Sequence, residues 1–261
     1  MTEAIDVLEP GYRPLFVALL QWAESDPAIR GLFLTGSIAE GTADRFSDLD
    51  LLAIAPTPGL AAAEQAISSV EAPLIVHRLP PGDDAFILSV VTNAWHRVDI
   101  AFAPAPGAGA IPVYNPDGLI APPPATAHFA PTPDDVLAIV TEFFRLYGLS
   151  VVVLGRGDVH AAHDGANLMR TLLINLLLAE IPAARPGPKK LRPALSDEQQ
   201  RVLRSLPALQ DNTQALLNFN RAIDATFVPR ARTLLTSLGG TWPTEVENAT
   251  REYLDRSPLY A

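Results

Sequence analysis

The spacing of apolar and polar residues divides the chain into two regions with different predicted secondary structure. The first region alternates short apolar runs with two helical patterns, over residues 13–25 and 59–70. Strands are predicted over 29–34, in the run that carries Asp48 and Asp50, and over 73–79, 86–91 and 96–103, the last two joined as a hairpin. Mixed strands with a few helices on one side favour an α+β sheet domain.

A proline-rich segment follows this region. Residues 104–133 contain nine prolines. Because proline lacks a backbone donor and has a fixed φ, neither a long helix nor a central strand fits there. We expect a linker or wrapping loop between two domains, with an edge strand at 111–114.

From Asp134 onward the pattern is helical. Helices are predicted from Asp134 to Tyr147 or beyond, over 159–180, from a cap at Ser196, from Thr213 with Pro229 kinking or dividing the helix, and over 243–256. The predicted fold class is therefore α+β, with a mixed-sheet domain at 1–125 followed by a C-terminal helical bundle at 131–261.

One stretch, residues 29–55, combines the features of a phosphate site and a metal site. An apolar run ends at Gly36-Ser37, and a second apolar run carries Asp48 and Asp50. Residues two apart on a strand point to the same side and lie about 6.6 Å apart, so the two carboxylates share a face. Such a pair can hold Mg²⁺, which keeps substrate phosphates among its ligands. Gly36 permits a tight turn, and Ser37 can begin a short helix whose amide groups attract phosphate.

This stretch resembles the signature of nucleotidyltransferases of the DNA polymerase β superfamily, in which Gly-Ser is followed by Asp-x-Asp between apolar residues. Here the two parts read Leu34-Thr35-Gly36-Ser37 and Ser47-Asp48-Leu49-Asp50-Leu51. The family expects a third carboxylate on a later strand, and Asp99 stands in the apolar run 97–102. Within the superfamily the chain looks most like the adenylyltransferases for aminoglycosides and lincosamides, which pair a small catalytic domain with a C-terminal helical bundle.

The resemblance implies Mg²⁺-dependent transfer of AMP from ATP to a hydroxyl of a small acceptor, such as one of these antibiotics. Asp48 and Asp50 are then the bridging metal ligands. Asp99 is expected to bind a metal and to accept the acceptor's proton, with Glu40 as the next candidate for the base. The active site is expected between the two domains.

Five further residues are expected to contact the nucleotide. Three lie in the signature stretch, and two are lysines on a Pro/Gly loop of the second domain, where a point charge can meet the β- and γ-phosphates. They are Gly36, Ser37, Ser47, Lys189 and Lys190.

Composition limits the partners and the compartment. The formal net charge is −10, which argues against broad affinity for nucleic acid and suits a basic small substrate better. The chain contains no cysteine, so disulfides, zinc thiolates and a catalytic thiol are excluded. The first residues lack the apolar run of a signal peptide, and no uninterrupted apolar run approaches the length of a membrane span. We expect a cytoplasmic protein without membrane contact; the sequence gives no oligomeric state.

Two alternatives stay open at this point. The same chemistry could act on a macromolecule, tRNA or protein, as in toxin-type nucleotidyltransferases. The second alternative is a non-catalytic binding module of the same fold, although the three intact carboxylates argue against it.

Overall fold

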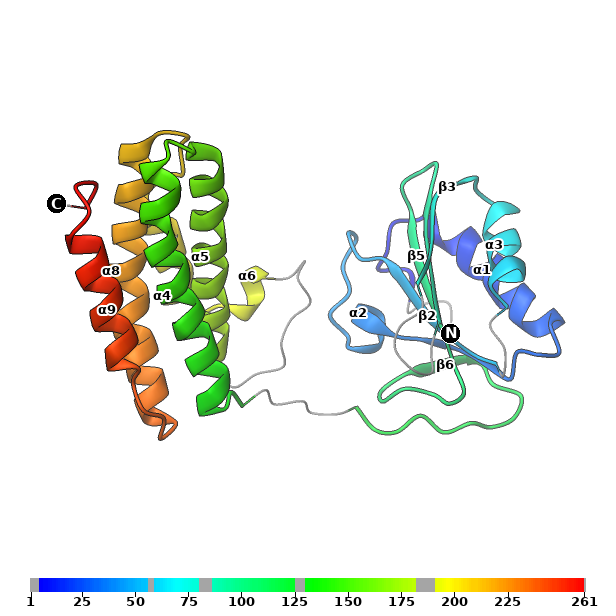
Figure 1. Ribbon diagram of the computed structural model, residues 1–261. Coiled ribbons are helices and arrows are strands. Elements are labelled where there is room, and N and C mark those ends of the chain that lie inside the picture. Colours follow the sequence, from blue (N-terminus) through cyan, green and yellow to red (C-terminus); the bar gives the residue numbers. More distant parts are fainter. Residues whose placement is uncertain (1–4, 56–58, 80–85, 125–129, 182–190, 261) are drawn as a thin grey trace. The chain divides into compact units, whose positions relative to one another are not determined.

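The computed structural model describes residues 5–55, 59–79, 86–124, 130–181 and 191–260, and the chain divides into two compact units. Met1–Ala125 contains the sheet, and the described part of Thr126–Ala261 is helical. Figure 1 shows the first unit in blue to green and the second in green to red. They are called the sheet unit and the helical unit below.

The described residues of the sheet unit form a six-stranded mixed sheet, as predicted for an α+β fold. Its order is β3-β4-β5-β2-β1-β6. The strands are β1 (Gly31–Leu34), β2 (Leu49–Ile54), β3 (Pro73–Leu79), β4 (Phe86–Thr92), β5 (Arg97–Ala103) and β6 (Ile111–Tyr114). Strands β2 and β5 are parallel, whereas the other neighbours are antiparallel. The sheet therefore brings two strands that are far apart in sequence together at its centre.

Two helices, α1 (Tyr12–Ser25) and α3 (Leu60–Ser68), lie side by side on one face of the sheet (Figure 1). They share a core with alternate residues of the central strands, including Leu49 and Leu51 of β2 and Val98 and Ile100 of β5. The residues between these, Asp50 and Asp99 among them, therefore point to the opposite face. Alternation along two strands thus decides on which face the acidic residues lie.

The helical unit is built around α4 (Pro133–Gly155), which contacts α5 (Val159–Ala179), α8 (Thr213–Ser237) and α9 (Thr244–Asp255). Phe143 of α4 stacks on Phe227 of α8 with ring centroids 4.0 Å apart. The predicted cap at Ser196 is confirmed, because Ser196 and Gln199 form a capping box at the start of α7 (Asp197–Ser205). The short helix α6 (Leu191–Ala194) was not predicted.

Helix α4 is long and apolar enough to cross a membrane by length and hydropathy alone, with a mean hydropathy of 1.8 over its best window. The sequence analysis expected no membrane-spanning segment because it considered only uninterrupted apolar runs. The apolar run of α4 is interrupted by Thr141, Glu142 and Arg145. Seven α4 residues lie in the hydrophobic core of the helical unit, Phe143 and Phe144 among them. This packing accounts for part of its apolar character, since 39% of that window is buried inside the structure.

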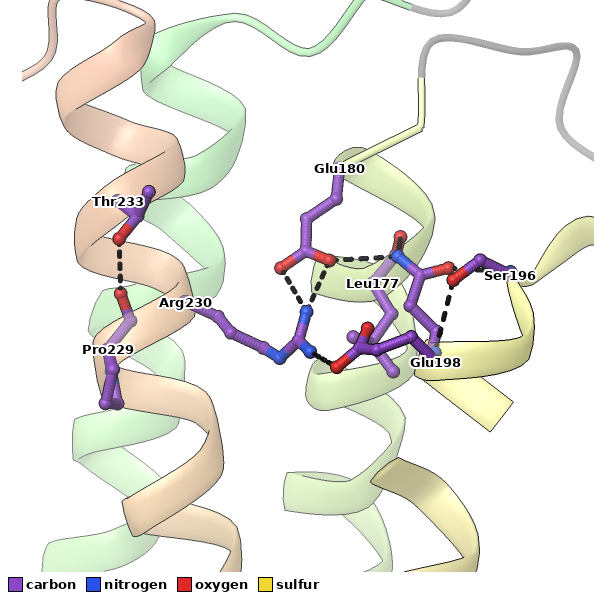
Figure 2. Close-up of polar contacts among 8 residues, drawn as sticks. Leu177, Glu180, Ser196, Glu198, Pro229, Arg230 and Thr233 are labelled. Atoms are coloured by element: carbon purple, nitrogen blue, oxygen red, sulfur yellow. Dashed lines mark hydrogen bonds and ion pairs between the residues drawn. The ribbon is translucent and has the colours of Figure 1, made fainter. Parts of the chain in front are cut away.

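Pro229 neither divides nor ends α8, which runs as one helix from Thr213 to Ser237. Beside it, Arg230 donates to both carboxylate oxygens of Glu180 at the end of α5 and also pairs with Glu198 of α7, as Figure 2 shows. Glu180, Pro229, Arg230 and Thr233 are among the residues that line a cavity of about 370 Å³. The guanidinium group of Arg230 thus links α8 to the end of α5 and to α7.

Candidate active site

Three carboxylates converge on the face of the sheet opposite α1 and α3. Asp50 of β2 and Asp99 of β5 are register partners on the two parallel strands, and Asp48 immediately precedes β2. One ligand oxygen from each of the three lies within 4.8 Å of the others, and all three residues are half-buried. The three predicted acidic residues therefore form one cluster that could hold a metal ion.

The side chain of Asp99 makes no hydrogen bond or ion pair with any residue in the described part of the chain. Its neighbour across the antiparallel pair is Ser89 of β4. A half-buried carboxylate usually has a partner. As far as the described residues show, both carboxylate oxygens of Asp99 are therefore available to a metal ion or to a proton.

Gly36 allows the turn between β1 and α2 to approach the three carboxylates closely. Its φ is +57°, a conformation that residues with a side chain rarely adopt. A Cβ added at this position would lie 2.8 Å from Cγ of Asp50, which is an overlap. The backbone N–H of Thr35 also donates to the carbonyl oxygen of Asp50, at 3.0 Å. The residue before helix α2 (Gly36–Ala39) is thus fixed directly against the acidic cluster.

Ser37, the second residue of α2, has a buried hydroxyl. Its Oγ is shielded from solvent and has no hydrogen-bond partner among the described residues. Buried polar atoms are nearly always satisfied, and an orphaned one next to a cluster of metal ligands points to a missing ligand. Its position fits the predicted contact with phosphate.

Ser47, which is predicted to contact phosphate, makes local hydrogen bonds in this structure. Its hydroxyl accepts a hydrogen bond from the backbone N–H of Asp44 at 3.0 Å and donates to the Asp44 carboxylate at 3.2 Å. Ser47 is also buried, so it stabilises the turn before β2. The contact with phosphate stays a prediction that this geometry does not favour.

Arg97 is a site residue that the sequence analysis did not single out. One guanidinium nitrogen lies 3.5 Å from the Asp48 carboxylate, and the other terminal nitrogen donates to the carbonyl oxygen of Phe46 at 2.9 Å. The available signal was its position two residues before Asp99, because residues two apart on a strand share a face.

A buried polar network holds the start of β5. His96, which is 7% exposed, places Nδ1 2.9 Å from the carboxylate of Glu71, and its ring lies 4.6 Å from that of Tyr12. The Tyr12 hydroxyl in turn accepts a hydrogen bond from the backbone N–H of Arg97 at 3.1 Å. Helix α1 and the segment after α3 therefore fix the strand end that carries Arg97 and Asp99.

The remaining candidates are one exposed glutamate and two lysines. Glu40 is exposed in the loop after α2, where its carboxylate accepts from Thr42 at 3.4 Å. Lys189 and Lys190 lie outside the residues that the structure describes.

Part of the chain matches a known protein family. Residues 19–79 match the model described as "Nucleotidyltransferase domain". The matched span contains Gly36, Ser37, Asp48 and Asp50, whereas Asp99 lies beyond it. No curated protein matches the chain.

Solved structures give weak similarities over most of the chain. An aminoglycoside 6-adenyltransferase from Bacillus subtilis is 16% identical, with a TM-score of 0.46, over 95% of this chain and 97% of that one. A putative nucleotidyltransferase from H. pylori is 12% identical, with a TM-score of 0.27, over 86% of this chain and 93% of that one. JHP933 from Helicobacter pylori is 14% identical, with a TM-score of 0.29, over 97% of this chain and 98% of that one. At these values the similarities support no statement about substrate.

The family match covers the turn and the paired aspartates that the sequence pattern had marked. The structure adds the third carboxylate beside them. Residues 19–79 of the sheet unit therefore match a nucleotidyltransferase domain, as the motif predicts.

Proposed function

We propose that this protein transfers AMP from ATP, in the presence of Mg²⁺, to a hydroxyl group of a small acceptor. The observation that carries the proposal is the cluster of Asp48, Asp50 and Asp99 directly beside the Gly36–Ser37 turn. Carboxylate oxygens supply what Mg²⁺ prefers, and the start of α2 supplies an orphaned hydroxyl for phosphate.

The residues present fit the divalent ion that this family of reactions uses. Three oxygen ligands within 4.8 Å of one another can surround an ion that completes its shell with water and substrate phosphates. Asp48, Asp50 and Asp99 would hold it. When bound, the ion would neutralise charge on the triphosphate and on the departing pyrophosphate.

The chain's own groups then have defined tasks. The acceptor's hydroxyl oxygen forms a bond to the α-phosphorus, and the bond from that phosphorus to the bridging oxygen breaks, releasing pyrophosphate. Asp99 takes the hydroxyl proton onto its carboxylate, because it has no partner among the described residues. Ser37 contacts a phosphate oxygen and helps to hold the triphosphate in line.

For the acceptor we propose an aminoglycoside- or lincosamide-type antibiotic, and hence a role in antibiotic resistance in the cytoplasm. This substrate class rests on the resemblance of the motif and of the domain order, 1–125 followed by 131–261. The net charge of −10 suits a basic small molecule and disfavours tRNA, whose binding needs a positive surface.

We further propose that Lys189 and Lys190 contact the β- and γ-phosphates from the second domain. The support is their place on a Pro/Gly-rich segment of the sequence. Alanine at either position should raise the KM for ATP, and an unchanged KM in both variants would make them ordinary surface lysines.

The function is tested by acceptor-dependent release of pyrophosphate from ATP and Mg²⁺, with a panel of aminoglycosides and lincosamides. Removing Mg²⁺ with a chelator should stop release, and Asp48→Asn or Asp50→Asn should abolish it without lowering the melting temperature. Activity that persists in either variant, or no release with any acceptor, contradicts the proposal.

A further inference from the structure

We infer that Phe46 and Arg97 form the acceptor side of the active site. In this inference, Phe46 packs on an apolar ring face of a hydroxylated ring compound, and Arg97 donates to one of its oxygens. The inference rests on the proposed function. It assigns residues to the acceptor-binding part of the site, which the nucleotide-binding motif does not include.

The strand order separates two sides of the site. Across the sheet the order is β5, β2, β1. The Gly36–Ser37 turn follows β1 and touches Asp50 of β2, so the phosphates belong on this side. Asp99 lies on β5, on the other side of Asp50. An acceptor that gives its proton to Asp99 must therefore approach from the β5 side.

Arg97 is the first residue of β5 and lies on this side of the acidic cluster. Asp50 is opposite Asp99 and Leu49 opposite Val98, so one further step back along the parallel register places Asp48 beside Arg97. The separation of 3.5 Å between their charged groups agrees with this. A guanidinium group has five N–H donors, and the contacts with Asp48 and Phe46 leave others for a ligand.

Phe46 is presented to solvent by a backbone that is fixed on both sides. Its N–H donates to the Asp44 carboxylate at 2.9 Å, and its carbonyl oxygen accepts from Arg97 at 2.9 Å. Ser47, the next residue, is buried against Asp44. The Phe46 side chain nevertheless remains 75% exposed. A large exposed aromatic ring on a backbone that is already fixed is a feature of recognition sites, since the backbone loses little further freedom on contact.

The chemistry of these two groups indicates the kind of acceptor. An aromatic face packs well against the apolar face of a saturated ring, and guanidinium N–H groups pair with ring or hydroxyl oxygens. The guanidinium of Arg45 lies 5.1 Å from the centroid of the Phe46 ring and helps to orient it. A ring-shaped polyol meets both requirements.

The test compares Michaelis constants in Phe46→Ala, with kanamycin and lincomycin as probes in the pyrophosphate-release assay. The KM for the acceptor that is turned over should rise roughly 5- to 20-fold, as expected for loss of one aromatic contact, while the KM for ATP stays within about twofold. Arg97→Lys, which keeps the charge but loses the planar fork, should also raise the acceptor KM more than the ATP KM.

A matched control removes an exposed apolar side chain elsewhere in the sheet unit. Leu74, 63% exposed, lies on β3 at the edge of the sheet, with β4 between it and β5, so Leu74→Ala should change neither KM. A Phe46→Ala variant that raises only the ATP KM, or that lowers the melting temperature and leaves both KM values unchanged, overturns the inference alone. No turnover of any acceptor by the wild-type protein overturns the proposed function and the inference with it.

Discussion

Asp50 and Asp99 face each other as register partners on two parallel strands, although 48 residues of chain separate them. This pairing gives the two carboxylates different neighbours. Asp50 is covered on the β1 side by the Gly36 turn, whereas Asp99 lies on the β5 side and has no partner among the described residues. The asymmetry favours Asp99 as the base.

Asp99→Asn should therefore affect the chemical step more than the capture of nucleotide. The amide keeps the shape of the side chain but loses its charge and basicity. We expect kcat to fall by roughly 10²- to 10⁴-fold, the contribution of a general base, while MgATP binds within a few-fold of wild type. Steady-state kinetics and titration calorimetry with MgATP measure the two effects. If MgATP binding is lost and kcat at saturation is kept, Asp99 acts only as a metal ligand and Glu40 becomes the next candidate for the base.

Gly36→Ala should disable the site through a steric overlap. The new Cβ would collide with the Asp50 carboxylate and would also strain a backbone with φ of +57°. Gly41 provides the control, because its φ is +68° but a Cβ there would meet nothing within 4 Å. Both variants should lose about 1 kcal/mol of stability from the backbone, whereas only Gly36→Ala should lose activity at least tenfold. Equal activity losses in the two variants would show that backbone strain alone is responsible.

Ser37→Ala tests whether the buried hydroxyl of Ser37, which has no partner among the described residues, binds a phosphate group of the substrate. Removing a buried hydroxyl that has no partner should leave the protein equally or more stable, because a desolvation penalty disappears. If Ser37 contacts the triphosphate, the same change should raise the KM for ATP by roughly 10- to 150-fold, as expected for the loss of one hydrogen bond to a charged group. Ser47→Ala is the comparison: it should lower the melting temperature through the lost bonds to Asp44 and change the KM for ATP less. The reverse pattern would assign the phosphate contact to Ser47.

The sequence predicted the sheet elements well, because each depends on local signals. Strands 73–79 and 111–114 agree with β3 and β6, and the positive φ of Gly36 follows from a turn that requires glycine. Alternation along a strand also placed Asp48 and Asp50 on one face, and the structure adds that this face is the one opposite α1 and α3.

Contacts between distant segments could not be predicted in the same way. The bond between Tyr12 and the backbone of Arg97 spans 85 positions and depends on how α1 packs on the sheet. Arg230 pairs with Glu180 and Glu198 only because three helices meet, and Pro229 lies within an unbroken α8 because tertiary packing overrides its local preference. Ser47 was assigned to phosphate by its place in the motif, whereas the folded turn directs its hydroxyl to Asp44.

The helical unit should lose stability in acid partly through Glu247 of α9. Burial alone would raise the pKa of this carboxyl, but hydrogen bonds from Trp242 and Arg251 and the charge of Arg232 outweigh burial and lower the pKa. A carboxyl whose folded pKa is depressed stabilises the fold above its unfolded pKa of about 4.3. That contribution is lost as the pH falls through the folded pKa.

Glu247→Gln should therefore destabilise the helical unit by roughly 1–3 kcal/mol at pH 7 and have a smaller effect near pH 3. Trp242 donates to Glu247 and can report the unfolding of this unit by fluorescence once the tryptophans of the sheet unit, Trp22 and Trp95, are changed to phenylalanine. Glu245→Gln is the matched control, since Glu245 lies in the same first turn of α9 but is exposed. Urea unfolding of each variant in this background between pH 3 and pH 7 gives the comparison. If Glu247→Gln and its parent lose stability in parallel across this range, the acid sensitivity of the helical unit does not come from Glu247.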